Sequence, residues 1–279
     1  MQSPRFAIAA VDRYLGVFDA FVQAGWQPLA LFTVPIQTNL DNFHAVGAYA
    51  EQHKSRVQLS RITEHDIHQL GEEGCDALIV AGYYWRIGDL RPAIKYGINF
   101  HASPLPEARG PYPMVRAILE GRDHWAVTCH KLEPKMDSGD ILAAENFAMA
   151  RDECHETLDL KIQMAARRLA SHVASDFNNL WGGATAQTGG SDWPRWTSEE
   201  RMIDFAWPVE QILRHLRAFG LIESTAPLGS ATISIRRAVG WTESHNHPPG
   251  QVVHTNQHTT VVAARDGYIG ILEWRYSAP

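Results

Sequence analysis

Ala77-Leu78-Ile79-Val80-Ala81 is a run of five apolar residues, which follows a helix-like segment that Gly74 closes. An apolar run of this length predicts a strand that is buried on both faces. The pattern continues outward from it, with strand-like runs at 6–11, 29–34, 56–59 and 97–101 and helix-like segments at 15–24, 42–53, 66–73 and 91–96. This β-α-β-α order predicts an α/β fold with a Rossmann-like, open, mostly parallel sheet covered on both faces.

The composition of the chain changes at residues 182–191, which are small, polar and rich in glycine. Before it, the pattern predicts a helix at 113–121, strands at 126–132 and 141–149, and a long helix at 154–181. After it come a helix at 208–219 and short strands at 230–239, 250–254, 259–264 and 268–275. We therefore expect a catalytic domain over 1–181, a linker over 182–200 and a small β-rich, OB-like, barrel-like domain over 201–279.

Composition excludes several classes of protein. Of 279 residues, 45% are apolar and 20% charged, with a net charge of −6, so neither a disordered chain nor a strongly basic nucleic-acid-coating surface is expected. A local basic patch stays possible. Cys75, Cys129 and Cys154 are far apart, which favours a reducing compartment. No apolar run approaches membrane-spanning length, and we expect a complete cytoplasmic protein without membrane partners.

Two polar segments carry the candidate chemistry. Asn99 and His101 lie two residues apart in a predicted strand, so their side chains share one face at the strand's end. An amide there can donate to a developing oxyanion, and an imidazole can transfer a proton near neutral pH. Asp137 lies in the turn Met136-Asp137-Ser138-Gly139, and a carboxylate that approaches His101 would orient and charge it. Taken singly, a solvated histidine and an ordinary Asp-Ser-Gly turn are the commoner interpretations.

Together these segments resemble the folate-dependent formyltransferases. Asn99-x-His101-x-Ser103-x-Leu105-Pro106 is similar to that family's Asn-x-His-x-Ser-Leu-Leu-Pro motif, with Pro104 replacing one leucine, and Asp137 matches the Asp of its Leu-Asp-x-Gly turn. The resemblance implies the formyltransferase fold and 10-formyltetrahydrofolate as donor, with no metal. It also implies that Asn99 holds the formyl oxygen, His101 supports the oxyanion and passes a proton, Asp137 orients His101, and Ser103 positions one of these side chains.

The resemblance further implies a folate-binding surface built from two segments. One follows the strand at 77–81, and the other precedes Asp137. The expected cofactor-binding residues are Tyr84, Trp85, Arg86, Ile87, Glu133, Lys135 and Met136. Without the resemblance, aromatic residues after a strand are more simply explained by packing beneath the edge of the sheet.

The acceptor is the open question. The tRNA-acting relatives carry a basic insertion after the second strand, whereas residues 35–42 contain no Lys or Arg. We therefore expect a small-molecule amine acceptor, namely an amino sugar, an amino acid or a hydroxylated amine. The alternatives are methionyl-tRNA formylation, formyl-folate hydrolysis and folate binding without transfer. The sequence predicts neither the pathway nor the oligomeric state.

Overall fold

The computed structural model describes residues 3–36 and 41–277. It divides into two compact units. The first comprises Met1–Pro113, His124–Ala148 and Leu160–Trp193, and the second comprises Met114–Asp123, Met149–Asp159 and Pro194–Pro279. Residues 182–193, expected to be part of a linker, are counted within the first unit, and two earlier segments are counted within the second. The boundaries drawn from the sequence at 181 and 201 stay a prediction.

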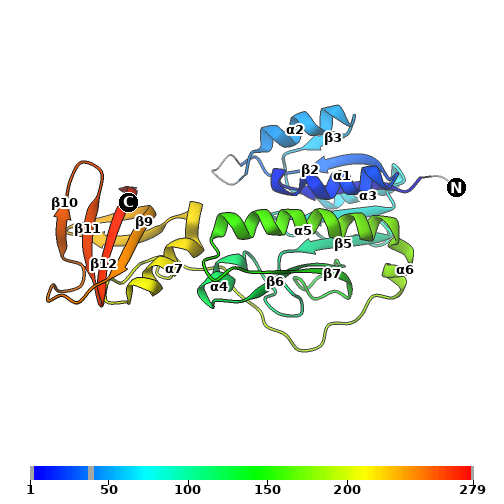
Figure 1. Ribbon diagram of the computed structural model, residues 1–279. Coiled ribbons are helices and arrows are strands. Elements are labelled where there is room, and N and C mark those ends of the chain that lie inside the picture. Colours follow the sequence, from blue (N-terminus) through cyan, green and yellow to red (C-terminus); the bar gives the residue numbers. More distant parts are fainter. Residues whose placement is uncertain (1–2, 37–40, 278–279) are drawn as a thin grey trace. The chain divides into compact units, whose positions relative to one another are not determined.

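The first unit is built on a seven-stranded mixed sheet of order β3-β2-β1-β4-β5-β6-β7 (Figure 1). Its parallel part consists of β1 (Arg5–Ala10), β2 (Gln27–Phe32), β3 (Arg56–Gln58), β4 (Ala77–Ala81) and β5 (Tyr96–His101). Then β6 (His124–Lys131) pairs antiparallel with β5, and β7 (Ile141–Ala148) pairs antiparallel with β6. The predicted Rossmann-like, mostly parallel sheet is confirmed.

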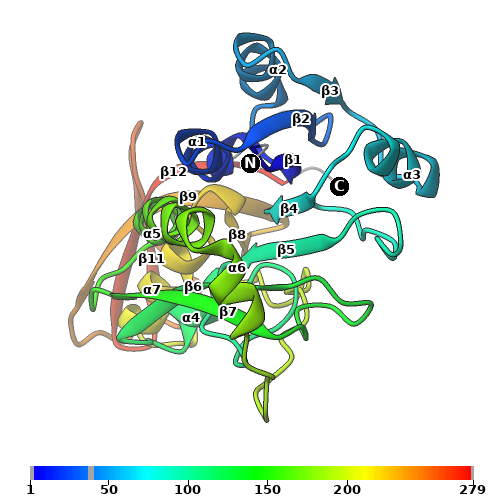
Figure 2. The same ribbon diagram turned by 90° about the vertical axis from the view of Figure 1, so that its right-hand side faces the viewer.

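Helices cover both faces of this sheet, as Figure 2 shows for α1 (Leu15–Gln23) and α5 (His155–Ser175) on one side and α3 (Glu64–Glu72) on the other. Strand β1 explains the arrangement, because alternate side chains of a strand point to opposite faces. The Phe6 ring packs against Phe18 and Phe21 of α1. Ala7 and Ala9 instead join a buried cluster that contains residues of α3. Helix α2 (Phe43–Gln52) follows β2 along the chain.

Two predicted helices differ from the structure. Residues 91–93 form turns and no helix, and residue 96 already belongs to β5, so the segment is too short to support an isolated helix. The long helix expected at 154–181 is divided at Asp176, where the backbone leaves the helical region, into α5 and α6 (Phe177–Gly182). The Asp176 carboxylate accepts a hydrogen bond from Nδ2 of Asn179, in the first turn of α6, at 2.6 Å.

The second unit contains an antiparallel sheet of order β10-β11-β12-β9-β8, with β10 and β8 as its edges in the described residues. Its strands are β8 (Ser224–Leu228), β9 (Ala231–Thr242), β10 (Val252–Thr255), β11 (Thr260–Ala264) and β12 (Gly267–Tyr276). Helix α7 (Val209–Phe219) packs Ile212 and Leu216 into the core of this sheet, and α4 (Met114–Leu119) contacts α7. The small β-rich domain is confirmed. Strand β8 was missed because Pro227 interrupts its pattern, and proline is tolerated at an edge.

His215 of α7 gives the second unit a predictable sensitivity to acid. Its Nε2–H donates to the carbonyl oxygen of Glu200 at 2.8 Å, and its Nδ1 accepts from the Ser224 hydroxyl at 3.0 Å. Burial lowers the pKa of this ring below its usual 6.5. The unfolded chain therefore binds a proton at a higher pH than the folded chain does, and the free energy of unfolding decreases as pH falls below about 6.5.

We expect His215→Gln to reduce this loss, because glutamine keeps a donor for Glu200 and does not titrate. The measurement is urea denaturation, followed by tryptophan fluorescence, at pH 7.5 and pH 5.5 for both proteins. Equal losses of unfolding free energy on acidification would contradict the assignment.

Among the described residues, no helix combines the length and the apolar character that crossing a bilayer requires.

Candidate active site

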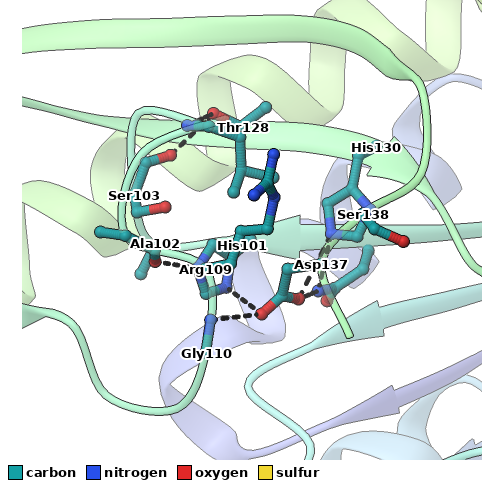
Figure 3. A network of polar contacts seen from close by, with 12 residues as sticks. His101, Ala102, Ser103, Arg109, Gly110, Thr128, His130, Asp137 and Ser138 are labelled. Carbon is teal, nitrogen blue, oxygen red and sulfur yellow. Dashed lines mark hydrogen bonds and ion pairs between the residues drawn. The ribbon is translucent and has the colours of Figure 1, made fainter. Parts of the chain in front are cut away.

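The candidate active site lies at the carboxyl end of β5, where ligands bind in open α/β sheets. Asn99 faces His130 of β6 across the strand pair, and His101 faces Thr128. Asn99 and His101 are two residues apart, so the pleat places both side chains on one face, as the sequence predicted. Figure 3 shows His101, His130 and Asp137 converging in this region.

His101 is buried and held between a backbone carbonyl and a carboxylate. Its Nε2 lies 3.1 Å from the carbonyl oxygen of Ala108, so in the neutral ring this nitrogen carries the proton and donates. Its Nδ1 lies 3.7 Å from Oδ2 of Asp137. Burial lowers the pKa of His101, while the charge of Asp137 acts in the opposite direction. The resting ring is neutral, with an unprotonated Nδ1 that faces a carboxylate.

Asp137 connects three parts of the site. Its Oδ2 accepts from the backbone N–H of Gly110 at 2.9 Å, and its Oδ1 accepts from Nδ2 of Asn99 at 3.3 Å. Burial by itself would raise the pKa of Asp137. The adjacent rings of His101 and His130 and the Gly110 hydrogen bond outweigh burial and lower this pKa to about 2. The carboxylate is therefore ionised throughout the physiological range.

His130 is a member of this cluster that sequence reasoning missed. Its Nδ1 lies 2.7 Å from the carbonyl oxygen of Lys131 and donates to it, so the neutral ring offers Nε2 as an acceptor. Nδ2 of Asn99 donates to that nitrogen at 3.2 Å, and Oδ1 of Asp137 lies 3.5 Å from it. The strand at 126–132 was predicted, but its register against β5 was not, and only the register places His130 opposite Asn99.

Ser103 lies near the cluster but supports a loop. Its hydroxyl donates to the carbonyl oxygen of Glu107 at 2.9 Å, while its own carbonyl accepts from the Thr128 hydroxyl at 2.7 Å. The Thr128 hydroxyl in turn accepts from the backbone N–H of Leu105 at 3.2 Å. Ser103 thus shapes the loop that presents the Ala108 carbonyl to His101, and its hydroxyl is not bonded to Asn99, His101 or Asp137.

The two segments expected to bind folate meet through one hydrogen bond. Nη2 of Arg86 donates to the carbonyl oxygen of Pro134 at 3.4 Å. Trp85 packs edge-on against Tyr83 with ring centroids 5.5 Å apart, and Ile87 packs against the buried cluster beneath the sheet. The hydroxyl of Tyr84 donates to the carboxylate of Asp41. Glu133, Lys135 and Met136 are exposed.

The arrangement can support acyl transfer at a carbonyl. Asn99 supplies an amide, His101 supplies a ring that can gain and lose a proton, and Asp137 supplies a fixed negative charge that stabilises the protonated ring. All three come from elements of one compact unit.

Comparison with known proteins matches this chain to one family. Residues 37–173 match the model described as "Formyl transferase", and residues 195–278 match "Formyl transferase, C-terminal domain". A methionyl-tRNA formyltransferase of Janthinobacterium sp. is 30% identical over 251 residues, which cover 86% of this chain and 72% of the relative.

Among solved structures, an N-formyltransferase from Helicobacter canadensis, in complex with folinic acid and dTDP-3-aminofucose, has a TM-score of 0.69 at 14% identity. The match covers 98% of this chain and all of that one. HypX from Aquifex aeolicus, in complex with tetrahydrofolic acid, has a TM-score of 0.65 at 17% identity. That match covers 99% of this chain but only 45% of HypX. At these identities the likeness concerns the fold.

The chain belongs to the folate-dependent formyltransferase family. It is a formyltransferase.

Proposed function

We propose that this enzyme transfers the formyl group of 10-formyltetrahydrofolate to the amine of a small-molecule acceptor. The observation that supports this most strongly is the cluster in which Asp137 accepts from Asn99 and faces Nδ1 of His101. An amide, an imidazole and an ionised carboxylate on one rigid sheet edge are the groups that acyl transfer to an amine requires.

In the proposed reaction, 10-formyltetrahydrofolate supplies the formyl group. A bond forms between the amine nitrogen and the formyl carbon, and the bond from that carbon to N10 of the folate breaks. Asn99 and His101 donate to the negative charge that develops on the formyl oxygen, after one Nδ2–H of Asn99 leaves His130 or Asp137 and the Nε2–H of His101 leaves the Ala108 carbonyl. The proton lost by the amine passes to the His101–Asp137 pair and from there to N10, so protons balance. Asp137 stays ionised and stabilises the protonated ring.

The donor would lie along the two segments that Arg86 connects. A pterin ring needs apolar walls and backbone hydrogen bonds, and Trp85 and Ile87 offer the walls. Backbone groups of residues 133–136, directly before Asp137, offer the hydrogen bonds. This placement puts the reactive end of the donor next to the carboxylate.

The charges described at the neighbouring strand ends show no excess of cations that would attract a polyphosphate. Asp12 follows β1 and Asp41 follows β2, and burial raises the pKa of Asp12. The nearby cation Arg13 lies 2.9 Å from the Asp41 carboxylate and is paired with it. Residues 35–42 carry no Lys or Arg. Within that stretch, residues 37–40 lie outside the described residues, so this point rests on the sequence.

The second unit adds no excess of positive charge. Residues 194–279 contain eight arginines, no lysine and eight carboxylates. Several of these arginines are paired, including Arg237 with Glu273 at 2.7 Å and Arg275 with Glu223 at 2.7 Å. A surface that binds the phosphates of tRNA gains its affinity from unpaired cations.

Methionyl-tRNA formylation is the second candidate function. Two relatives with sequence similarity, each 30% identical to this chain, are named methionyl-tRNA formyltransferases. The match to the C-terminal model also covers residues 195–278. Against this candidate stand the paired arginines of the second unit and the absence of Lys and Arg from residues 35–42.

A comparison of acceptors tests the proposal. Purified enzyme with 10-formyltetrahydrofolate is given nucleotide-linked amino sugars, amino acids, N-hydroxylated amines and methionyl-tRNA, and tetrahydrofolate release is measured. We expect at least one small amine to exceed methionyl-tRNA in kcat/KM by about 10²-fold or more. His101→Ala sets the background rate. A higher kcat/KM for methionyl-tRNA that declines steeply with salt would overturn the proposed acceptor class.

A further inference from the structure

Residues 185–193, here called the strap, run along the loops of the first unit that carry the candidate active site. The backbone of Thr185 pairs with Ile141 of β7, and the backbone of Arg109 pairs with Asp192. The backbone N–H of Arg109 donates to the carbonyl of Ser191 at 2.9 Å, and the Ser191 hydroxyl accepts from the N–H of Ala108 at 3.0 Å. The strap is therefore bonded to the loop whose Ala108 carbonyl holds His101.

Gln187 is the strap residue that connects the two catalytic loops. Its Nε2 donates to the carbonyl oxygens of Asp137 and Gly139, each at 2.8 Å. Its Oε1 accepts from Nε of Arg109 at 2.9 Å. Both amide hydrogens and the amide oxygen are thus used, which defines the orientation of the side chain.

The turn that receives these bonds needs them. Asp137 has φ of 52°, in the left-handed region. This conformation costs a non-glycine residue about 1–2 kcal/mol, and it persists only where contacts with the surrounding structure offset that cost. Gly139 lies close against the backbone of Lys131, because a Cβ added at this glycine would overlap the Lys131 carbonyl oxygen. Gln187 satisfies two carbonyls of this turn and bonds it to Arg109, the neighbour of Gly110, whose N–H binds the Asp137 carboxylate.

We propose that Gln187 is a positioning residue, which holds the Asp137 turn in the conformation that directs its carboxylate at His101 and Asn99. This inference rests on the proposed function for its kinetic consequence. Gln187 touches no reacting atom in this account, and it acts through the backbone of Asp137.

The test compares Gln187→Leu, which keeps the volume but removes all three hydrogen bonds, with Thr188→Ala, a change at the adjacent, exposed strap residue. We expect Gln187→Leu to lower kcat by about 10–100-fold with both KM values within about threefold, because positioning of the pair is lost rather than binding. Thr188→Ala should match wild type. Gln187→Glu, which retains an acceptor for Arg109 but cannot donate to the two carbonyls, should resemble Gln187→Leu.

A second readout does not depend on turnover. The groups that face His101 are Asp137 and His130, and the charge of Asp137 raises the pKa of the ring. When the carboxylate is no longer held, this pKa should decrease further, which NMR titration of the His101 ring measures in the substrate-free protein. A lower midpoint in Gln187→Leu, with Thr188→Ala unchanged, is the expected result.

Unchanged kcat and an unchanged His101 midpoint in a folded Gln187→Leu protein would overturn the positioning role. If Gln187→Leu does not fold, the kcat of Gln187→Glu decides, because the added charge of this variant would itself shift the His101 midpoint. A wild-type protein that formylates no amine would overturn the proposed function, and the NMR titration would then decide the role of Gln187 alone.

Discussion

Asp137→Asn is expected to lower kcat by about 10³-fold, as removal of the orienting carboxylate does in comparable relays. Asparagine keeps the shape of the side chain and can still accept from the Gly110 N–H. It removes the negative charge 3.7 Å from Nδ1 of His101, so protonation of that ring is no longer stabilised. The measurement is single-turnover formyl transfer at saturating donor and acceptor.

Asp140→Asn is the matched control, with the same substitution three residues along the chain. Its carboxylate pairs with Lys131 at 3.1 Å and is half exposed, outside the cluster. We expect activity within about twofold of wild type, since exposed ion pairs contribute about 0–1 kcal/mol. Equal losses in both variants would show that the turn needs its charges for structure, and would remove Asp137 from the proposed relay.

Gly110→Ala is expected to lower the free energy of unfolding by about 3 kcal/mol and kcat by at least about 10²-fold. Gly110 has φ of 114°, which side chains rarely adopt, and a Cβ there would overlap the carbonyl oxygen of Trp193. The backbone must then move, and the N–H that holds the Asp137 carboxylate moves with it. Denaturant unfolding and turnover are measured on the same preparation.

Gly189→Ala separates backbone strain from steric overlap. Gly189 also has a positive φ, 67°, but a Cβ there meets no atom within 4 Å. We expect a cost of about 1 kcal/mol and little loss of kcat. If Gly110→Ala behaved no worse than Gly189→Ala, the close approach of the strap to Gly110 would not constrain the site.

The fold was largely predictable because its signals are local. The apolar run at 77–81 is buried along its whole length as β4, and the alternation around it produced the parallel sheet. The errors arise where local signals conflict with tertiary demands. The segment at 91–96 is too short for a helix because β5 begins at Tyr96, and Asp176 interrupts the helix expected at 154–181.

The site was predictable only in part. Asn99 and His101 follow from the period of a single strand, and Asp137 was found through its family motif. The place of His130 in the site could not be predicted, because it depends on the register of β6 against β5. The place of Gln187 could not be predicted either, because its bonding partners Gly139, Asp137 and Arg109 lie 48 to 78 residues earlier in the chain. Such long-range pairing leaves no periodic trace in the sequence, and for that reason the sequence did not predict the contacts of the strap with the site.

The most direct test of the central claim is the fate of the formyl carbon. Enzyme is mixed with 10-formyltetrahydrofolate labelled with ¹³C in the formyl group, together with the best small amine, and the products are followed by NMR. We predict that the label appears as an N-formyl amide of the amine, in equal amount to the tetrahydrofolate released, and that His101→Ala abolishes both. Label that appears as formate at the same rate with or without the amine, or that stays on the folate, would contradict formyl transfer to a small amine.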